Sequence, residues 1–442
     1  MQVIAALRRL WRHAPFRRLL ALRTLSQAAD GTLQVGMASY ILFSPQSQPD
    51  AASIAGVLAL TLLPYTLLGP FVAPLLDRWP RRDVALYSDV TRAALAAVIG
   101  LIIAAGATTG VWAVALYVAL LLAMSINRFM LAGLSAGLQH TVDADEYLTA
   151  SSILPTVGPL GVVIGAILGF TTRAVLGGVV PAHQADAVVF GLAAAMFVGS
   201  VLVCRGFSRG ALGPDVAAER VGVGAVLGGL AAAGRHMVSR PASVLALALM
   251  AVTRLLFGLW SVAVILGARR LWNPVDRPGG ALADLTVWGL FTGAGFVLAA
   301  PLVPALVRWL GLRRGASLML LVAAAVSVGA AFSTAKPVLF AASFLIGLAV
   351  QSFKICVDTV VQAHVDEEFK GRAFTFYDMG FNAAFVLSGV VAMGVLPSTG
   401  LSAPAFVGVA VGYAACAAVL LAVGRRLGPD VLERGTGDLL RS

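Results

Sequence analysis

Near the N-terminus, four polar side chains recur every three or four residues: Arg23, Gln27, Asp30 and Gln34. This spacing would place all four on one face of a helix. Because the surrounding residues are apolar, Asp30 would lie away from water, where a carboxylate either pairs with an arginine or takes up a proton. The stripe therefore indicates either a proton-transfer site or a permanent salt bridge. For a salt bridge, Arg23 and Arg128 are the expected partners.

A single cation, Arg254, lies inside another apolar stretch. Charged residues within such stretches are costly and normally face a cavity or a partner. Arg254 could therefore bind an anionic substrate or act as a counter-charge to Asp30. Trp260 follows in the same stretch, where a tryptophan either lines a cavity or, more commonly, is packed or faces lipid.

Two further groups of charges lie closer to the ends of apolar runs. Lys354 and Asp358 are one helical turn apart and can form an ion pair. Together with Asp378 they are expected to form a gate or a structural network rather than a substrate site. We interpret Asp89 and Arg92 as structural residues that can also join a latch on the cytoplasmic side.

The elements that carry these residues are too apolar for a water-soluble domain. Of 442 residues, 59% are hydrophobic and 12% are charged, whereas soluble domains carry roughly 25% charged residues. A bilayer solvates such surfaces, and helices satisfy their own backbone hydrogen bonds there. The net charge of +11 does not indicate nucleic-acid binding, because the basic residues form short clusters between apolar runs.

Twelve apolar runs approach the roughly 20 residues that a membrane-spanning helix needs. Six precede a polar stretch, Arg205–Arg240, and six follow it. The predicted spans are Leu19–Phe43, Ala52–Leu76, Val84–Ala105, Val111–Leu138, Leu148–Val175, Ala187–Cys204, Val244–Gly267, Leu285–Val307, Ala316–Phe332, Val338–Val361, Ala373–Leu396 and Ala403–Val423. We therefore predict an all-α integral membrane protein with a six-helix half at 1–204, a cytoplasmic loop at 205–240, and a second half with a cytoplasmic tail at 241–442.

The distribution of basic residues predicts the orientation. If the N-terminus is cytoplasmic, 22 Lys and Arg residues lie in inner segments, 5 in outer segments and the remaining 5 within spans. Positive residues concentrate on the cytoplasmic side of membrane proteins. Both termini are therefore expected in the cytoplasm.

The segment 73–82, APLLDRWPRR, lies between the second and third predicted spans. It resembles the loop signature of the major facilitator superfamily, G-x-L-x-D-R-x-G-R-R, although alanine and proline replace its two glycines. In that family the acidic and basic residues of this loop latch neighbouring helices on the cytoplasmic side. The resemblance assigns this role to Asp77, Arg78, Arg81 and Arg82. A plain positive-inside anchor would explain the arginines but not Asp77.

The resemblance extends over nearly the whole chain. Lys370-Gly371-Arg372 precedes the eleventh span, where the family often has Gly-Arg, and the segments 26–31 and 127–129 resemble an actinobacterial branch of exporter-like members. The fifth span contains Gly158-Pro159-Leu160-Gly161, a partial match to a motif of the family's exporters. The alternative is ordinary close packing of small residues.

The family implies a secondary transporter with a cavity between two halves. We expect it to export an amphipathic small molecule, driven by protons, from the inner (cell) membrane, as an antiporter that functions as a monomer. Multidrug, siderophore-like and lipid-like cargoes are all compatible. The alternatives are uptake or lysolipid flipping by the same fold and, ranked lower, a membrane sensor or enzyme. The sequence contains no nucleotide-binding G-x-x-x-x-G-K-[ST] and no H-E-x-x-H, and no cofactor or metal is expected.

Overall fold

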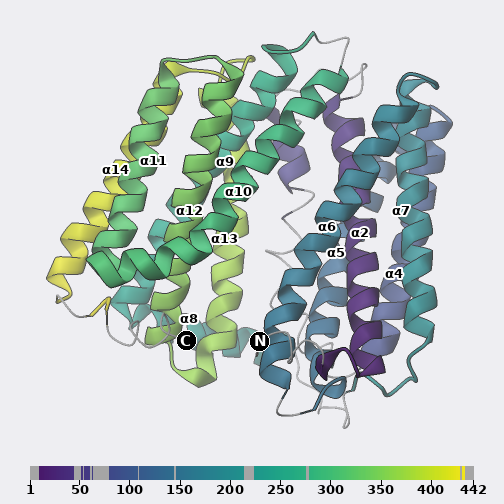
Figure 1. Cartoon of the computed structure of the whole chain (residues 1–442), viewed down its shortest axis with the longest axis horizontal. Coiled ribbons are helices and arrows are strands. Elements are labelled where there is room, and N and C mark those ends of the chain that lie inside the picture. The colour runs from purple at the N-terminus through teal and green to yellow at the C-terminus, as the bar shows by residue number, and fades with distance from the viewer. Residues whose placement is uncertain are drawn as a thin grey trace. The chain divides into compact units, whose positions relative to one another are not determined.

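The computed structural model describes residues 9–43, 51–52, 54–59, 62, 79–107, 109–143, 146–213, 223–274, 278–428 and 431–433. These residues form helices and connecting turns, with no strand among them. The helices are α2 (Ala14–Phe43), α4 (Arg81–Ala104), α5 (Val111–Gly137), η1 (Leu138–His140), α6 (Tyr147–Leu176), α7 (Ala182–Arg205), α8 (Val223–Val238), α9 (Pro241–Arg270), α10 (Pro278–Leu310), α11 (Leu312–Ala331), α12 (Lys336–His364), α13 (Glu367–Val395) and α14 (Ala403–Arg426). The all-helical fold is confirmed (Figure 1).

Ten helices in the described part of the chain are long and apolar enough to cross a membrane, namely α4 to α7 and α9 to α14. The first predicted span is helical, as α2, but its polar stripe makes it less apolar than these ten. The second, Ala52–Leu76, lies largely outside the described residues. Several helices begin before their predicted spans: α7 begins at Ala182 and α10 at Pro278. The reason is that helical hydrogen bonding continues into the polar residues at the helix ends, whereas the hydropathy pattern predicts only the apolar part of each helix.

The stretch 205–240, which we predicted as a loop, contains the helix α8. Its residues are mainly Val, Ala, Gly and Leu, and it packs against the start of α13. The His236 ring stacks on Phe369 with centroids 4.4 Å apart, and Arg240 donates to Asp366 at 3.0 Å. The composition of the whole stretch concealed this short apolar segment.

Prolines and glycines determine where several helices begin. α4 follows Pro80, and α9 begins at Pro241. At the first helical position the missing proline N–H costs no helical hydrogen bond. Gly311 alone separates α10 from α11, with φ of +76°, a conformation that favours glycine. The Ser402 side chain accepts from the Ala405 N–H and caps α14.

The chain divides into two compact units. Unit 1 comprises Met1–Ser44 and Leu67–Val226, and unit 2 comprises Pro45–Thr66 and Leu227–Ser442. The predicted domain boundaries at residues 204 and 240 remain a prediction.

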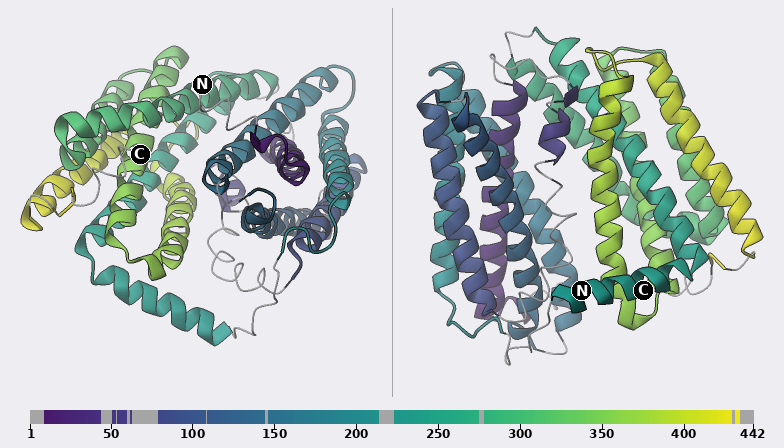
Figure 2. Two further views of the ribbon diagram at one scale, coloured as in Figure 1. Left: turned by 60° about the horizontal axis from the view of Figure 1, so that its bottom comes forward. Right: turned by 180° about the vertical axis from the view of Figure 1, so that it is seen from behind.

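Both units use the same pairing of helices. In unit 1, α2 packs along α6, and α4 packs along α7 (Figure 2). In unit 2, α9 packs along α13, and α11 packs along α14. The first helix of each unit therefore pairs with the fifth predicted span of its half, and the third with the sixth. This repetition agrees with a fold built from two related halves.

Connecting segments meet at the ends of each unit. In unit 1, the Arg81 N–H donates to the Gly213 carbonyl at 3.0 Å, and His13 lies 2.7 Å from Glu146. All of these segments were expected on the cytoplasmic side. At the opposite end of unit 2 from Asp366, Lys336 pairs with Asp284 at 2.7 Å.

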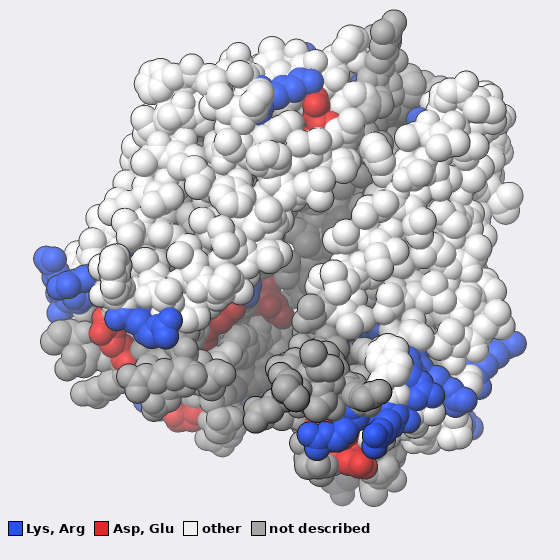
Figure 3. Space-filling model, viewed as in Figure 1, with Lys and Arg blue, Asp and Glu red and all other residues white. Residues whose placement is uncertain are grey.

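Between their ends, the helices expose large apolar side chains. Leu160, Ile167, Leu290 and Val297 are each at least 56% exposed, which suits contact with lipid rather than with water. In Figure 3 the described Lys and Arg side chains lie near the ends of the helices, and the surface between them is largely uncharged.

Candidate functional site

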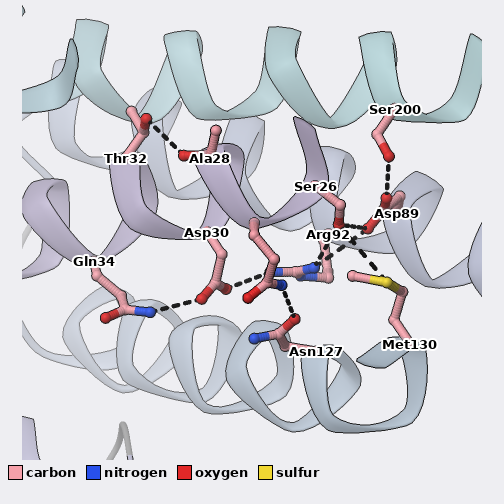
Figure 4. A network of polar contacts seen from close by, with 11 residues as sticks. Ser26, Ala28, Asp30, Thr32, Gln34, Asp89, Arg92, Asn127, Met130 and Ser200 are labelled. Carbon is pink, nitrogen blue, oxygen red and sulfur yellow. Dashed lines mark hydrogen bonds and ion pairs between the residues drawn. The ribbon is translucent and has the colours of Figure 1, made fainter. Parts of the chain in front are cut away.

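The polar stripe of α2 is buried within unit 1. Asp30 is 1% exposed and forms an ion pair with Arg92 of α4. Gln34, one turn further along α2, donates to the second oxygen of the Asp30 carboxylate at 2.6 Å. Asp30 therefore has one charged and one neutral donor (Figure 4).

Arg92 also contacts a second carboxylate, Asp89, one turn earlier on α4. The distance from Arg92 Nη1 to Asp89 Oδ1 is 3.3 Å. Asp89 accepts from Ser26 at 3.0 Å and from Ser200 of α7 at 2.6 Å. Asp89, Arg92, Ser26 and Ser200 are fully buried, so three helices enclose the network (Figure 4).

The guanidinium of Arg92 lies over the Phe197 ring, 4.2 Å from its centroid. Because the arginine is held by two carboxylates and one aromatic face, it is fixed between Asp30 and Asp89. We call Asp30, Asp89 and Arg92 the carboxylate–arginine triad. With both acids ionised, the triad has a net charge of −1. Uptake of one proton would make it neutral.

The partner of Asp30 differs from the expected ones. Arg23 donates to Ser135 of α5 at 3.0 Å, and Gln27 donates to Asn127 at 3.0 Å. The pairing of Asp30 with Arg23 was therefore wrong. Arg128 is on α5, but its side chain is outside the described set. Sequence spacing defined the stripe on α2 but contained no information on which face of α4 meets it.

Three glycines of α6, at positions 161, 165 and 169, face α2. A methyl group at Gly165 would collide with the backbone carbonyl of Ala28, and one at Gly161 would lie 2.8 Å from the Thr24 carbonyl. Thr32 donates to the Gly165 carbonyl at 2.9 Å. The Gly-rich segment of the fifth span thus provides close packing against the helix that carries Asp30.

A second buried ion pair lies near the other end of unit 1. Arg173 of α6 contacts Asp186 of α7 at 2.5 Å, and Ser39 of α2 donates to the same carboxylate oxygen at 2.7 Å. Arg173, which the charge count assigned to an outer segment, lies in the last turn of α6 and is 8% exposed. In the sequence, the sign of this pair is Asp186, an acidic residue near the start of α7.

The predicted latch is only partly described. Asp77 and Arg78 lie outside the described residues, so the latch remains a prediction. Arg81 donates to the Leu212 carbonyl at 3.3 Å. Arg82 pairs with Asp83, which is also held by Arg209 at 2.7 Å. Asp89 and Arg92, which we interpreted as structural residues able to join the latch, are members of the triad; their part in a latch remains a prediction.

In unit 2, Arg254 of α9 lies among phenylalanine rings. Its guanidinium carbon is 4.0 Å from the Phe385 centroid, 4.1 Å from Phe381 and 5.3 Å from Phe257. Trp260 is fully buried and donates to Ser343 at 3.0 Å. The packed alternative for Trp260 is therefore confirmed.

The ion pair of Lys354 and Asp358 is confirmed, with a distance of 2.8 Å. The Lys354 ammonium also lies 5.3 Å from the Tyr377 ring centroid. Asp378 is next along α13, and its carbonyl accepts from Asn382 at 2.8 Å. Their role as a gate remains a prediction.

Two patterns can be mistaken for enzymatic sites. Residues 133–137, GLSAG, match the G-x-S-x-G of hydrolases, but they lie inside α5 rather than at a strand-to-helix turn. His13, Asp143 and Glu146 have potential metal-ligand atoms within 4.8 Å of one another. A hydrogen bond between His13 and Glu146 explains why these atoms lie so close together. This bond holds the N-terminal segment.

Comparison with known proteins places these features in context. No family model matches the chain. An uncharacterized MFS-type transporter of Mycobacterium tuberculosis is 35% identical over 424 residues, which cover 95% of this chain and 93% of the relative. A relative of the same description in Mycobacterium bovis has the same values.

Solved transporters share the fold at low sequence identity. The nucleoside transporter NupG matches with a TM-score of 0.65 and 14% identity over 92% of this chain and 98% of its own. A peptide transporter, POT, in complex with sulfate matches with a TM-score of 0.68 and 14% identity over 94% and 95%. At these identities the likeness concerns the fold alone.

Proposed function

Because this chain belongs to the major facilitator superfamily of transporters, we propose that it is a proton-coupled secondary transporter that exports an amphipathic small molecule by alternating access. It acts as a monomer in the cell membrane, with both termini in the cytoplasm. The charge asymmetry between its connecting segments supports this orientation.

The observation that carries proton coupling is the charge imbalance of the triad. Two fully buried carboxylates share one guanidinium. An uncompensated buried charge is strongly unfavourable, so the triad favours a state with one proton bound. A conformation that separated Asp30 from Arg92 would strengthen proton binding at Asp30, because the compensating cation would be lost.

Of the two carboxylates, Asp30 is the better proton carrier. Asp89 accepts from two hydroxyls as well as from Arg92, and hydrogen bonds to the charged form stabilise that form. Among the described residues, Asp30 has only Arg92 and the neutral amide of Gln34 as donors. Its charged form therefore depends on one ion pair, which a conformational change can break.

The test begins with a comparison of compound accumulation in cells with and without the protein. A compound whose accumulation falls is then given to purified protein in liposomes containing a pH-sensitive dye. We expect the compound to produce proton flux, and a pH gradient to drive its movement. Vesicles of opposite orientation separate export from uptake. Gradient-independent movement of the compound, with no proton flux, would overturn the coupling.

A further inference from the structure

Arg254 is an unmatched cation within a membrane-spanning helix. It has no ion pair and donates no hydrogen bond to any residue in the described ranges, and its Nε is buried without an acceptor. In unit 1, by contrast, Arg92 has two carboxylates. In unit 2, Asp358 is occupied by Lys354.

Aromatic rings pack against the guanidinium of Arg254. Phe381 and Phe385 are one turn apart on α13, and their centroids lie 4.1 and 4.0 Å from the guanidinium carbon. The guanidinium carbon therefore lies over both rings. The π-faces attract the cation, but they do not neutralise its charge or accept the N–H groups at its edge. The described residues around Arg254 therefore supply no anion.

Arg254 in unit 2 corresponds to Gln27 in unit 1, because each lies four residues before a closely packed glycine. Arg254 lies four residues before Gly258, which packs closely on Ser388 and Phe385 of α13. Gln27 lies four residues before Gly31, which packs closely on Val162 of α6. Gln27 has a protein partner, the amide of Asn127. The matching position in unit 2 carries a charge and has no hydrogen-bond or ion-pair partner among the described side chains.

We infer that Arg254 binds the anionic group of the cargo, and that Phe257, Phe381 and Phe385 contact its apolar part. The cargo class is then an amphipathic anion bearing a carboxylate or a phosphate. A guanidinium binds either group through two parallel hydrogen bonds. This inference rests on the proposed transport function and specifies its substrate.

Binding to the purified protein in zwitterionic nanodiscs tests the inference without a pH gradient. The probes are octyl phosphate, nonanoate and octyltrimethylammonium, which share an octyl chain and differ in headgroup. Wild-type protein should bind one or both anions more tightly than the cation. Arg254→Gln should weaken anion binding at least tenfold and leave the weak binding of the cation unchanged. The relative affinity for phosphate and carboxylate identifies the anionic group.

Three further variants keep the test decisive. Lys336→Gln removes a cation of unit 2 that already has a partner, Asp284, and should bind the anions like wild type. Arg254→Lys keeps the charge but loses the planar fork, so it should retain part of the affinity. Phe385→Leu keeps the arginine and should weaken binding of the octyl chain. It also provides the test if Arg254→Gln does not fold.

The inference is overturned if wild type binds neither anion, or if Arg254→Gln binds them as tightly as wild type. Arg254 would be a counter-charge in the proton pathway if its loss changed the pH dependence of transport but not anion affinity. These outcomes are distinct from failure of the proposed function. Anion binding that depends on Arg254, without transport driven by a pH gradient, would refute proton coupling and leave the binding site intact.

Discussion

At the scale of single residues, the triad combines a structural and a functional requirement. Arg92 holds Asp89 and Asp30 together inside unit 1, so removing it would leave two buried carboxylates. Removing one partner of a buried ion pair typically costs about 3–5 kcal/mol. Removing one carboxylate, by contrast, leaves a balanced pair. The members of the triad should therefore respond very differently to neutralisation.

Asp30→Asn should behave as a permanently protonated form. The amide cannot exchange a proton, so accumulation driven by a pH gradient should be lost, while counterflow of substrate should survive. Arg92 keeps Asp89 as a partner, so the variant should fold. Gradient-driven transport and counterflow in liposomes are the two measurements. A well-folded variant that still responds to the gradient would show that Asp30 does not carry the proton.

Arg92→Gln should destabilise the protein by about 3–5 kcal/mol. Adding Asp30→Asn to this variant should restore part of the loss, because one of the two stranded carboxylates is then neutral. Thermal unfolding of the wild type, both single variants and the double variant measures the coupling between the two sites. Strictly additive effects would mean that the ion pair contributes nothing to stability.

The residues of this site differ in how far sequence alone could predict them. Lys354 and Asp358 were paired correctly, because their contact depends only on the spacing within one helix. The buried stripe around Asp30 followed in the same way. Its partner did not, because the contact of Asp30 with Arg92 depends on the rotation of α4 against α2, which no local pattern encodes.

At the scale of helices, the contact of α2 with α6 determines where Asp30 lies. The glycines of α6 allow the two backbones to approach so closely that Thr32 donates to the Gly165 carbonyl. In lipid there is no hydrophobic force between helices, so such packing and hydrogen bonding hold them together. Sequence identified the small residues but not the helix against which they pack.

Gly165→Ala should disturb this contact, because the new methyl group would meet the Ala28 carbonyl. We expect a loss of about 1–3 kcal/mol in stability and slower gradient-driven transport. Gly191→Ala on α7 is the matched control, since nothing lies within 4 Å of its added methyl group; it should be neutral or stabilising by about 0.5–1 kcal/mol. Equal effects of the two substitutions on unfolding temperature would argue against close packing at Gly165.

At the scale of the whole molecule, hydropathy predicted most of the long helices. Long apolar runs define membrane helices because lipid excludes unsatisfied backbone groups. The same reasoning fails for a short helix: α8 was missed because the polar composition of the whole stretch 205–240 outweighed its apolar residues. The repeated pairing of the first helix with the fifth and of the third with the sixth also did not follow from hydropathy, because it depends on tertiary contacts.

The orientation of the chain in the membrane is the prediction that belongs to this scale. The positive-inside pattern places the turn after α7 in the cytoplasm and the turn before α12 outside. Ser208 and Thr334 lie in these turns and are exposed. The native cysteines, Cys204, Cys356 and Cys416, are buried, so an impermeant maleimide should label the unmodified protein weakly. Ser208→Cys should be protected in intact cells and react after permeabilisation, whereas Thr334→Cys should react in both. Labelling of Ser208→Cys from outside would reverse the orientation, and with it the direction of proton entry on which export depends.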